Sequence, residues 1–195
     1  MTSTVDPAGP CLRFVLADAV SADDLEAGLK AAASSQGLAL SPPGDQDERP
    51  DYRCRTWDFR PGNAYAQLID DGAIDTRWLS LCASMTVLFA LQASLSDHIA
   101  WVARDRLFAA AQKGGPRDLV RLALGTNALE DEAVEALLAR ALGAEDTDMR
   151  AAAAEAIYLL RWPQLRSAVT DALARESDAG VKAMLEEIAG RDGSR

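Results

Sequence analysis

The chain has 195 residues, which is enough for one large domain or two small ones. Hydrophobic residues make up 49% of it and charged residues 26%, a composition that excludes wholesale disorder. The formal net charge of −10 argues against a nucleic-acid partner, because phosphate binding requires a dense surface of Lys and Arg.

The first residues lack the basic flank and apolar run of a secretory signal, so a cytoplasmic location is expected. The richest apolar stretch, Trp78 to Trp101, is interrupted by polar side chains, so we expect no membrane helix and no membrane partner. The cysteines are odd in number, widely separated and without a C-x-x-C pair. This pattern predicts reduced, buried thiols at Cys11, Cys54 and Cys82.

The N-terminal part begins with a strand and a helix. Leu12, Phe14 and Leu16 alternate with other residues, as in a strand with one apolar face. Ser21 can cap a helix over 22–36, which ends near Gly37. A short strand is expected at 38–40, followed by a polar, proline-bounded loop over 41–50.

Three further strands are expected over 52–59, 64–69 and 76–82. Turns separate them, at Arg60-Pro-Gly-Asn63 and at Asp70-Asp-Gly72. The resulting order is strand, helix, strand, loop and three strands. We therefore predict a small α+β domain over residues 1–83, with an antiparallel sheet and a helix on one face.

From Ser84 onward the apolar period changes to that of a helix. The stripe of Leu88, Leu91, Leu95 and Ile99 predicts a long connecting helix, continuous or kinked toward Gln112, within residues 84–115. Beyond it, an all-α segment over 116–195 is expected. Its predicted helices cover 116–125, 130–142, 147–161, 163–175 and 178–189.

Three segments of this helical part share a weak repeat, in which an acid precedes an apolar and then a basic residue. They begin at Asp118, Asp146 and Asp178, and small and apolar residues follow each at helical spacing. The pattern resembles HEAT repeats, most clearly over 146–157 with the following helix. That resemblance implies stacked helix pairs in an α-solenoid; an unrelated helical bundle is the alternative. The first unit departs most from the pattern, because Gly125 stands where a longer helix is expected.

Residues with catalytic chemistry are few. His98 follows Asp97 directly, and neighbours in a helix point in different directions, so a partly buried structural histidine is expected. Cys82 lies between strand and helix, but no His and Asn arrangement supports a catalytic thiol. No metal-ligand spacing or phosphate-binding glycine motif occurs. We therefore expect no catalytic, cofactor-binding or metal-binding residue.

Aromatic residues on the three later strands allow two interpretations. They are either packed in the core against the helix over 22–36, or part of a partner-binding surface together with two arginines. The candidate partner-binding residues are Arg53, Arg55, Trp57, Phe59, Tyr65 and Trp78. Trp162, just before Pro163, is expected to fill the space between the helices of one repeat.

These features together favour a non-enzymatic protein-binding module, such as an inhibitor, an immunity-type protein or an adaptor. Its acidic character predicts a partner protein with basic patches. One alternative is an enzyme with a pocket between sheet and helices that uses carboxylates with His98 or Cys82. Another is an acidic secretion chaperone, which would be a homodimer.

Overall fold

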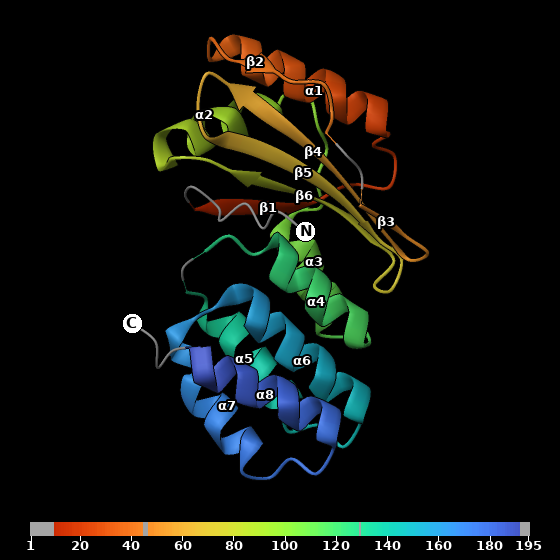
Figure 1. Ribbon diagram of the computed structural model, residues 1–195. Helices are drawn as coiled ribbons and strands as arrows, with labels where there is room; N and C mark the ends of the chain where they lie inside the picture. Colours follow the sequence, from red (N-terminus) through yellow and green to blue (C-terminus); the bar gives the residue numbers. More distant parts are fainter. Residues whose placement is uncertain (1–9, 45–46, 129, 192–195) are drawn as a thin grey trace. The chain divides into compact units, whose positions relative to one another are not determined.

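The computed structural model describes residues 10–44, 47–128 and 130–191. The chain forms two compact units, Met1–Val102 and Ala103–Arg195. The division falls at residue 102 rather than at the expected boundary near residue 84. Figure 1 labels the elements of both units in chain order.

The N-terminal unit is built on an antiparallel sheet with the order β1-β6-β5-β4-β2, in which β3 also pairs with β4. This arrangement confirms the predicted α+β class and every predicted strand. The structure adds β3, which lies in the segment expected to be a loop. The strands are β1 (Cys11–Val15), β2 (Ala39–Leu40), β3 (Asp47–Arg49), β4 (Tyr52–Arg60), β5 (Ala64–Asp71) and β6 (Thr76–Cys82).

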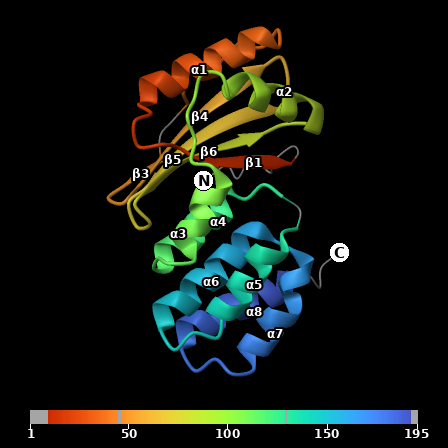
Figure 2. The ribbon, with the colours of Figure 1, turned by 180° about the vertical axis from the view of Figure 1, so that it is seen from behind.

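Two helices, α1 (Ala22–Ser35) and α2 (Met85–Leu95), cover one face of this sheet, as both ribbon views show (Figures 1 and 2). Ser21 starts α1 with a capping box. The Asp24 amide donates to Ser21 Oγ, and the Ser21 amide donates to the Asp24 carboxylate, both at 3.1 Å. The core between sheet and helices is fully buried and apolar. Its members include Leu25, Leu29, Trp57, Phe59, Leu79, Leu81, Leu88, Leu91 and Leu95.

The expected long helix over 84–115 is wrong. The chain leaves helical geometry after Leu95, and the next helix, α3, spans Arg104–Ala111. Between them the chain pairs with the end of β1: the Val102 amide donates to the Val15 carbonyl at 2.8 Å. The Trp101 ring stacks on Phe14 with 4.7 Å between ring centroids. These long-range contacts outweigh the local helical period.

The described residues of the C-terminal unit contain helices and links but no strand, and each of the five predicted helices is present. The segment expected as one helix over 163–175 begins with a short 3-10 turn, η1. The elements after α3 are α4 (Pro116–Gly125), α5 (Glu132–Ala141), α6 (Thr147–Leu160), η1 (Pro163–Leu165), α7 (Arg166–Leu173) and α8 (Ala179–Arg191).

The helices of this unit pack in a regular way. α3 contacts α4, α5 contacts α6, and α7 contacts α8; in addition α4 contacts α6, and α6 contacts α8. The central helix α6 buries four alanines, Ala152, Ala153, Ala154 and Ala156. Small side chains let the neighbouring helices approach closely.

Candidate functional site

The six candidate partner-binding residues do not form one surface. Trp57 and Phe59 are 0% exposed and lie in the core beneath the helices, so neither ring can reach a partner. For these two residues the core-packing interpretation is the correct one. Arg53 and Arg55 share their side of β4; Arg53 is exposed, and the Arg55 guanidinium lies 5.9 Å from the Trp57 ring centroid.

Tyr65 and Trp78 lie on the opposite face of the sheet, because their positions alternate with those of the core residues on β5 and β6. Tyr65 is directly opposite Cys82, and Trp78 is opposite Ile69. Partial burial raises the pKa of the Tyr65 hydroxyl. The candidate aromatic and arginine residues therefore lie on two different faces of the sheet. The alternation of side chains along a strand already allowed this outcome for Tyr65 and Trp78.

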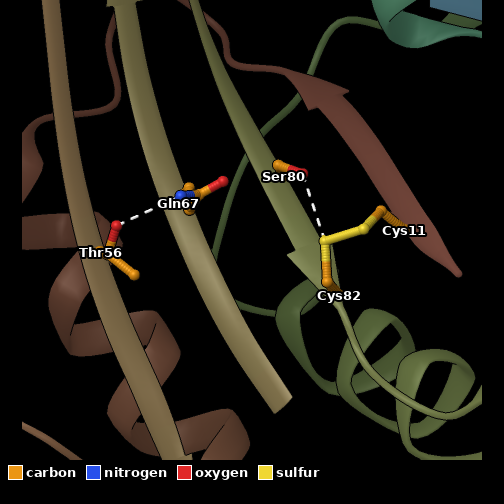
Figure 3. The surroundings of a disulfide bond; sticks show 5 residues. All are labelled: Cys11, Thr56, Gln67, Ser80 and Cys82. Atoms are coloured by element: carbon orange, nitrogen blue, oxygen red, sulfur yellow. Dashed lines mark hydrogen bonds between the residues drawn. A yellow bond between two sulfur atoms is a disulfide. The ribbon is translucent and has the colours of Figure 1, made fainter. Parts of the chain in front are cut away.

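The same opposite face carries a row of polar side chains across four strands. The register aligns Arg13, Ser80, Gln67 and Thr56 on β1, β6, β5 and β4. Figure 3 shows the last three of these side chains, and the Gln67 amide nitrogen donates to Thr56 Oγ1 at 3.4 Å. The row is polar, but the Arg13 guanidinium stays protonated and the hydroxyl and amide side chains of the others are neither general bases nor activated nucleophiles.

A disulfide joins Cys11 on β1 to Cys82 on β6 (Figure 3). The two residues are direct cross-strand partners with a Cα–Cα distance of 4.1 Å. The prediction of reduced thiols is therefore wrong for both. It also removes Cys82 as a nucleophile, since a disulfide sulfur has no thiolate to offer. Cys54, on β4, is not part of this disulfide.

His98 lies in the turn after α2 and is exposed, as is Asp97. The expectation of a partly buried histidine is wrong. The helix ends earlier than expected, so this residue does not share the buried stripe of Leu91 and Leu95.

Sequence reasoning missed one surface feature, an apolar pair on α2. Met85 is 48% exposed and Phe89 is 55% exposed, and they are the exposed large hydrophobic residues among residues 10–44, 47–128 and 130–191. They lie one turn apart, on the side of the helix away from the buried Leu88 and Leu91. The four-residue spacing was visible in the sequence, but a helix that is apolar on most sides gave no indication of which side would be exposed.

In the C-terminal unit, an ion pair joins two helices. Arg150 lies in the first turn of α6, and Glu176 lies just before α8. Arg150 Nε donates to Glu176 Oε2 at 2.8 Å. The hydrogen bonds from Arg150 are the largest cause that lowers the pKa of Glu176 from 4.5 to about 2, and the hydrogen bond from the Asp178 amide is the second. Arg150 also donates to the Ala144 carbonyl at 3.0 Å. The pair fixes the start of α6 against the start of α8.

Trp162 is buried, and its placement between the helices of one repeat stays a prediction. The residue is 6% exposed, and its indole N–H donates to the Ala128 carbonyl at 3.0 Å, across the stretch that holds α5 and α6. This hydrogen bond therefore links the turn before η1 to the segment that precedes α5.

A hollow of about 350 Å³ lies beside β2 at the edge of the sheet. Its lining includes Leu40, Thr56, Asp58 and Arg60, and the last two form an ion pair at 3.8 Å. Within the described part of the chain, no three His, Cys, Asp or Glu side chains are grouped so as to hold a metal ion. In that part no helix is long and apolar enough to span a bilayer.

No protein-family model, no curated protein and no solved structure matches this chain. Its function is therefore inferred from its own fold and surface.

Proposed function

We propose that this protein is a protein-binding module whose C-terminal unit is a short HEAT-like stack. The observation that carries the proposal is the packing of alternate helices, α4 on α6 and α6 on α8. In stacked repeats each unit buries its apolar face against the next one, so second-neighbour helices touch. Such stacks present an extended surface to a macromolecule.

The ion pair between Arg150 and Glu176 supports the repeat interpretation. Arg150 belongs to the unit that begins at Asp146, and Glu176 lies two residues before Asp178, which begins the next unit. Asp146 and Asp178 both accept amide hydrogen bonds at the starts of their helices. A basic residue of one unit thus pairs with an acid that lies two residues ahead of the next unit, while the acids of the pattern itself accept backbone amide hydrogen bonds.

The proposed partner is a protein with basic patches, and the proposed roles are those of an inhibitor, an immunity-type protein or an adaptor. A formal charge of −10 speeds encounter with a basic surface through long-range attraction. The enzymatic alternative loses one of its two named residues, because Cys82 is held in the disulfide.

The cytoplasmic location stays a prediction. The Cys11–Cys82 disulfide does not favour it, because cytosolic thiols are kept reduced in most cells. The disulfide fits an oxidising compartment or a cell surface better.

The proposal is tested by cross-linked capture from a lysate of the source cell, followed by quantitative mass spectrometry. One bait is the native protein. A second bait carries Asp148→Lys, Asp171→Lys and Glu186→Lys, which reverse three exposed acids of the helical unit. We expect a basic protein that is enriched on the native bait and depleted on the second.

A matched third bait carries Asp18→Lys, Asp23→Lys and Asp51→Lys, three exposed acids of the N-terminal unit. Both variant baits undergo the same change in net charge, and each set includes one acid in a first helical turn. Equal depletion on the two would show that overall charge, and not the helical stack, recruits the partner. A native bait that enriches no protein above background would refute the proposal.

A further inference from the structure

The helices α3 and α4 carry a basic surface on an acidic protein. Residues 106–121 contain four bases and one acid, a net charge of +3, whereas the whole chain has a formal net charge of −10. The four bases are Arg106, Lys113, Arg117 and Arg121, which we name the basic strip. Arg106, Lys113 and Arg117 are exposed, and Arg121 is half-buried.

The four side chains lie on the outer sides of the two helices. Arg106 and Lys113 are seven residues, or two turns, apart, so they lie on one side of α3 and of the turn that ends it. Arg117 and Arg121 are four residues apart and share the exposed side of α4. Along the helix axis the first two bases are about 10 Å apart and the second two about 6 Å apart.

A contact between the helices brings these two sides together. α3 packs against α4, and a Cβ on Gly114 would meet the Asp118 carboxylate and the Ala110 carbonyl. Ala110 lies one turn after Arg106, and Asp118 lies one turn before Arg121. The bases therefore flank the seam between the two helices on its solvent side. Asp118, which is half-buried, is the acid that lies at this seam.

These cations lack the acids that neutralise other arginines of the helical unit. Arg104 pairs with Asp131, and Arg150 pairs with Glu176. No ion pair or side-chain hydrogen bond joins a base of the strip to another described residue. The Nε of Arg121 is also buried without a hydrogen-bond partner. A cation that is partly removed from water and unpaired is unfavourable, so an anion at the exposed end of this guanidinium is stabilising.

The spacing of the bases fits an extended anion better than a small one. Bases that lie about 6–10 Å apart along the helices cannot all contact a single phosphate ion. In an extended peptide, side chains on one face repeat about every 7 Å, so a row of Asp or Glu can reach successive bases. A nucleic-acid strand fits less well. It carries a charge at every nucleotide and continues past the strip, where it meets exposed acids such as Asp105 and Glu130.

We propose that the basic strip binds an acidic segment of a partner protein, whose Asp or Glu side chains pair with Arg106, Lys113, Arg117 and Arg121. The strip is opposite in sign to the acidic surface that attracts a basic partner, and binding here is independent of that partner. Exposed ion pairs are weak one by one, so a short segment binds with a dissociation constant of roughly 0.1–1 mM at low salt. Added NaCl weakens this binding by screening.

The experiment is a fluorescence anisotropy titration of a labelled hexaglutamate peptide with the full-length, oxidised protein at low and high NaCl. Arg106→Glu with Lys113→Glu, both at exposed positions, should raise the dissociation constant at least about tenfold, because each change replaces an attraction by a repulsion. Arg117→Glu with Arg121→Glu, on the other helix, should have an effect of similar size.

A matched control reverses two exposed bases of the same unit that lie outside the strip, Arg140→Glu with Lys182→Glu. It makes the same change in net charge and should raise the dissociation constant by no more than about threefold. Asp118→Asn removes the acid at the seam and should lower the dissociation constant at least about twofold. A loss of folding cannot mimic this tighter binding, and circular dichroism checks that each variant is folded.

A native protein that does not bind hexaglutamate at millimolar concentration and low salt would overturn the proposal. Equal losses in the strip variants and in the control would do the same, because net charge alone would then explain the binding. Competition distinguishes the other anions. A hexathymidine strand, or inorganic phosphate, that displaces the labelled peptide at a lower concentration than unlabelled hexaglutamate would assign the strip to nucleic acid or to a small ion, and would refute an acidic peptide.

Discussion

Removing the Cys11–Cys82 disulfide should destabilise the N-terminal unit by about 4 kcal/mol. The bond joins residues 71 positions apart, and so it closes a loop that contains most of this unit. In the chain-entropy account, closing a loop of this length restricts the unfolded chain by about 4 kcal/mol at 25 °C. The loss falls on the N-terminal unit alone, because both cysteines belong to it.

The measurement is urea unfolding of the oxidised native protein and of a Cys11→Ala and Cys82→Ala double variant. Both are monitored by far-UV circular dichroism, with and without a reducing agent. We expect the reducing agent to lower the unfolding midpoint of the native protein toward that of the variant. The variant itself should not respond, although it retains Cys54.

Thiol counting provides an independent check. The denatured, unreduced native protein should show one reactive thiol, and the reduced protein should show three, since the chain has three cysteines. Three thiols before reduction, or an unfolding midpoint that does not change on reduction, would refute the reasoning.

Two further predictions concern the helices. The pKa of Glu176 is lower in the folded state than its usual 4.5, so the stabilisation from Arg150 is complete above about pH 4.5 and is lost as the pH falls toward 2. Glu176→Gln should remove this acid sensitivity from the unfolding of the helical unit. It should also lower the free energy of unfolding by roughly 2 kcal/mol at neutral pH. A variant with an unchanged pH profile would contradict this prediction. Gly28→Ala should lower the free energy of unfolding by roughly 1–2 kcal/mol, because a Cβ there would lie 2.6 Å from Ile99 Cδ1. Gly190→Ala, where a Cβ meets nothing within 4 Å, should instead raise stability by a few tenths of a kcal/mol, and equal effects of the two changes would show that helix propensity alone decides.

The local elements were predictable because their signals are local. Alternating residues such as Leu12 and Phe14 indicated β1, and Ser21 with Asp24 marked the start of α1. In the helical unit, Pro116 at the first turn of α4 and Asp146 at the cap of α6 marked the helix starts within a residue. Each of these residues acts on the backbone within four positions of itself.

The predictions that were wrong concern contacts between residues far apart in the chain. The helix over 84–115 was expected from a stripe that includes Ile99, yet Trp101 pairs with Leu16 and Val102 with Val15, at the end of β1. The disulfide pairs cysteines with no local motif, and an odd cysteine count made pairing look unfavourable. No local rule reveals either contact.

The candidate surface was predictable only in part. The parity of β4 placed Trp57 and Phe59 together, and the core-packing alternative turned out to be right for both. The exposure of Phe89 could not be predicted, because α2 is apolar on most sides and only the packed sheet and α1 show which of its leucines are covered.

The position of β1 has a consequence for the order in which the protein folds during synthesis. This strand is made first, yet its partners are β6 and the residues up to Val102. It must remain unpaired on the ribosome until the whole N-terminal unit has left the exit tunnel. The helical unit, whose neighbouring helices contact each other directly, can instead assemble in short steps as it emerges. A translational pause far enough beyond residue 102 for that residue to have left the tunnel would therefore help the first strand find its place.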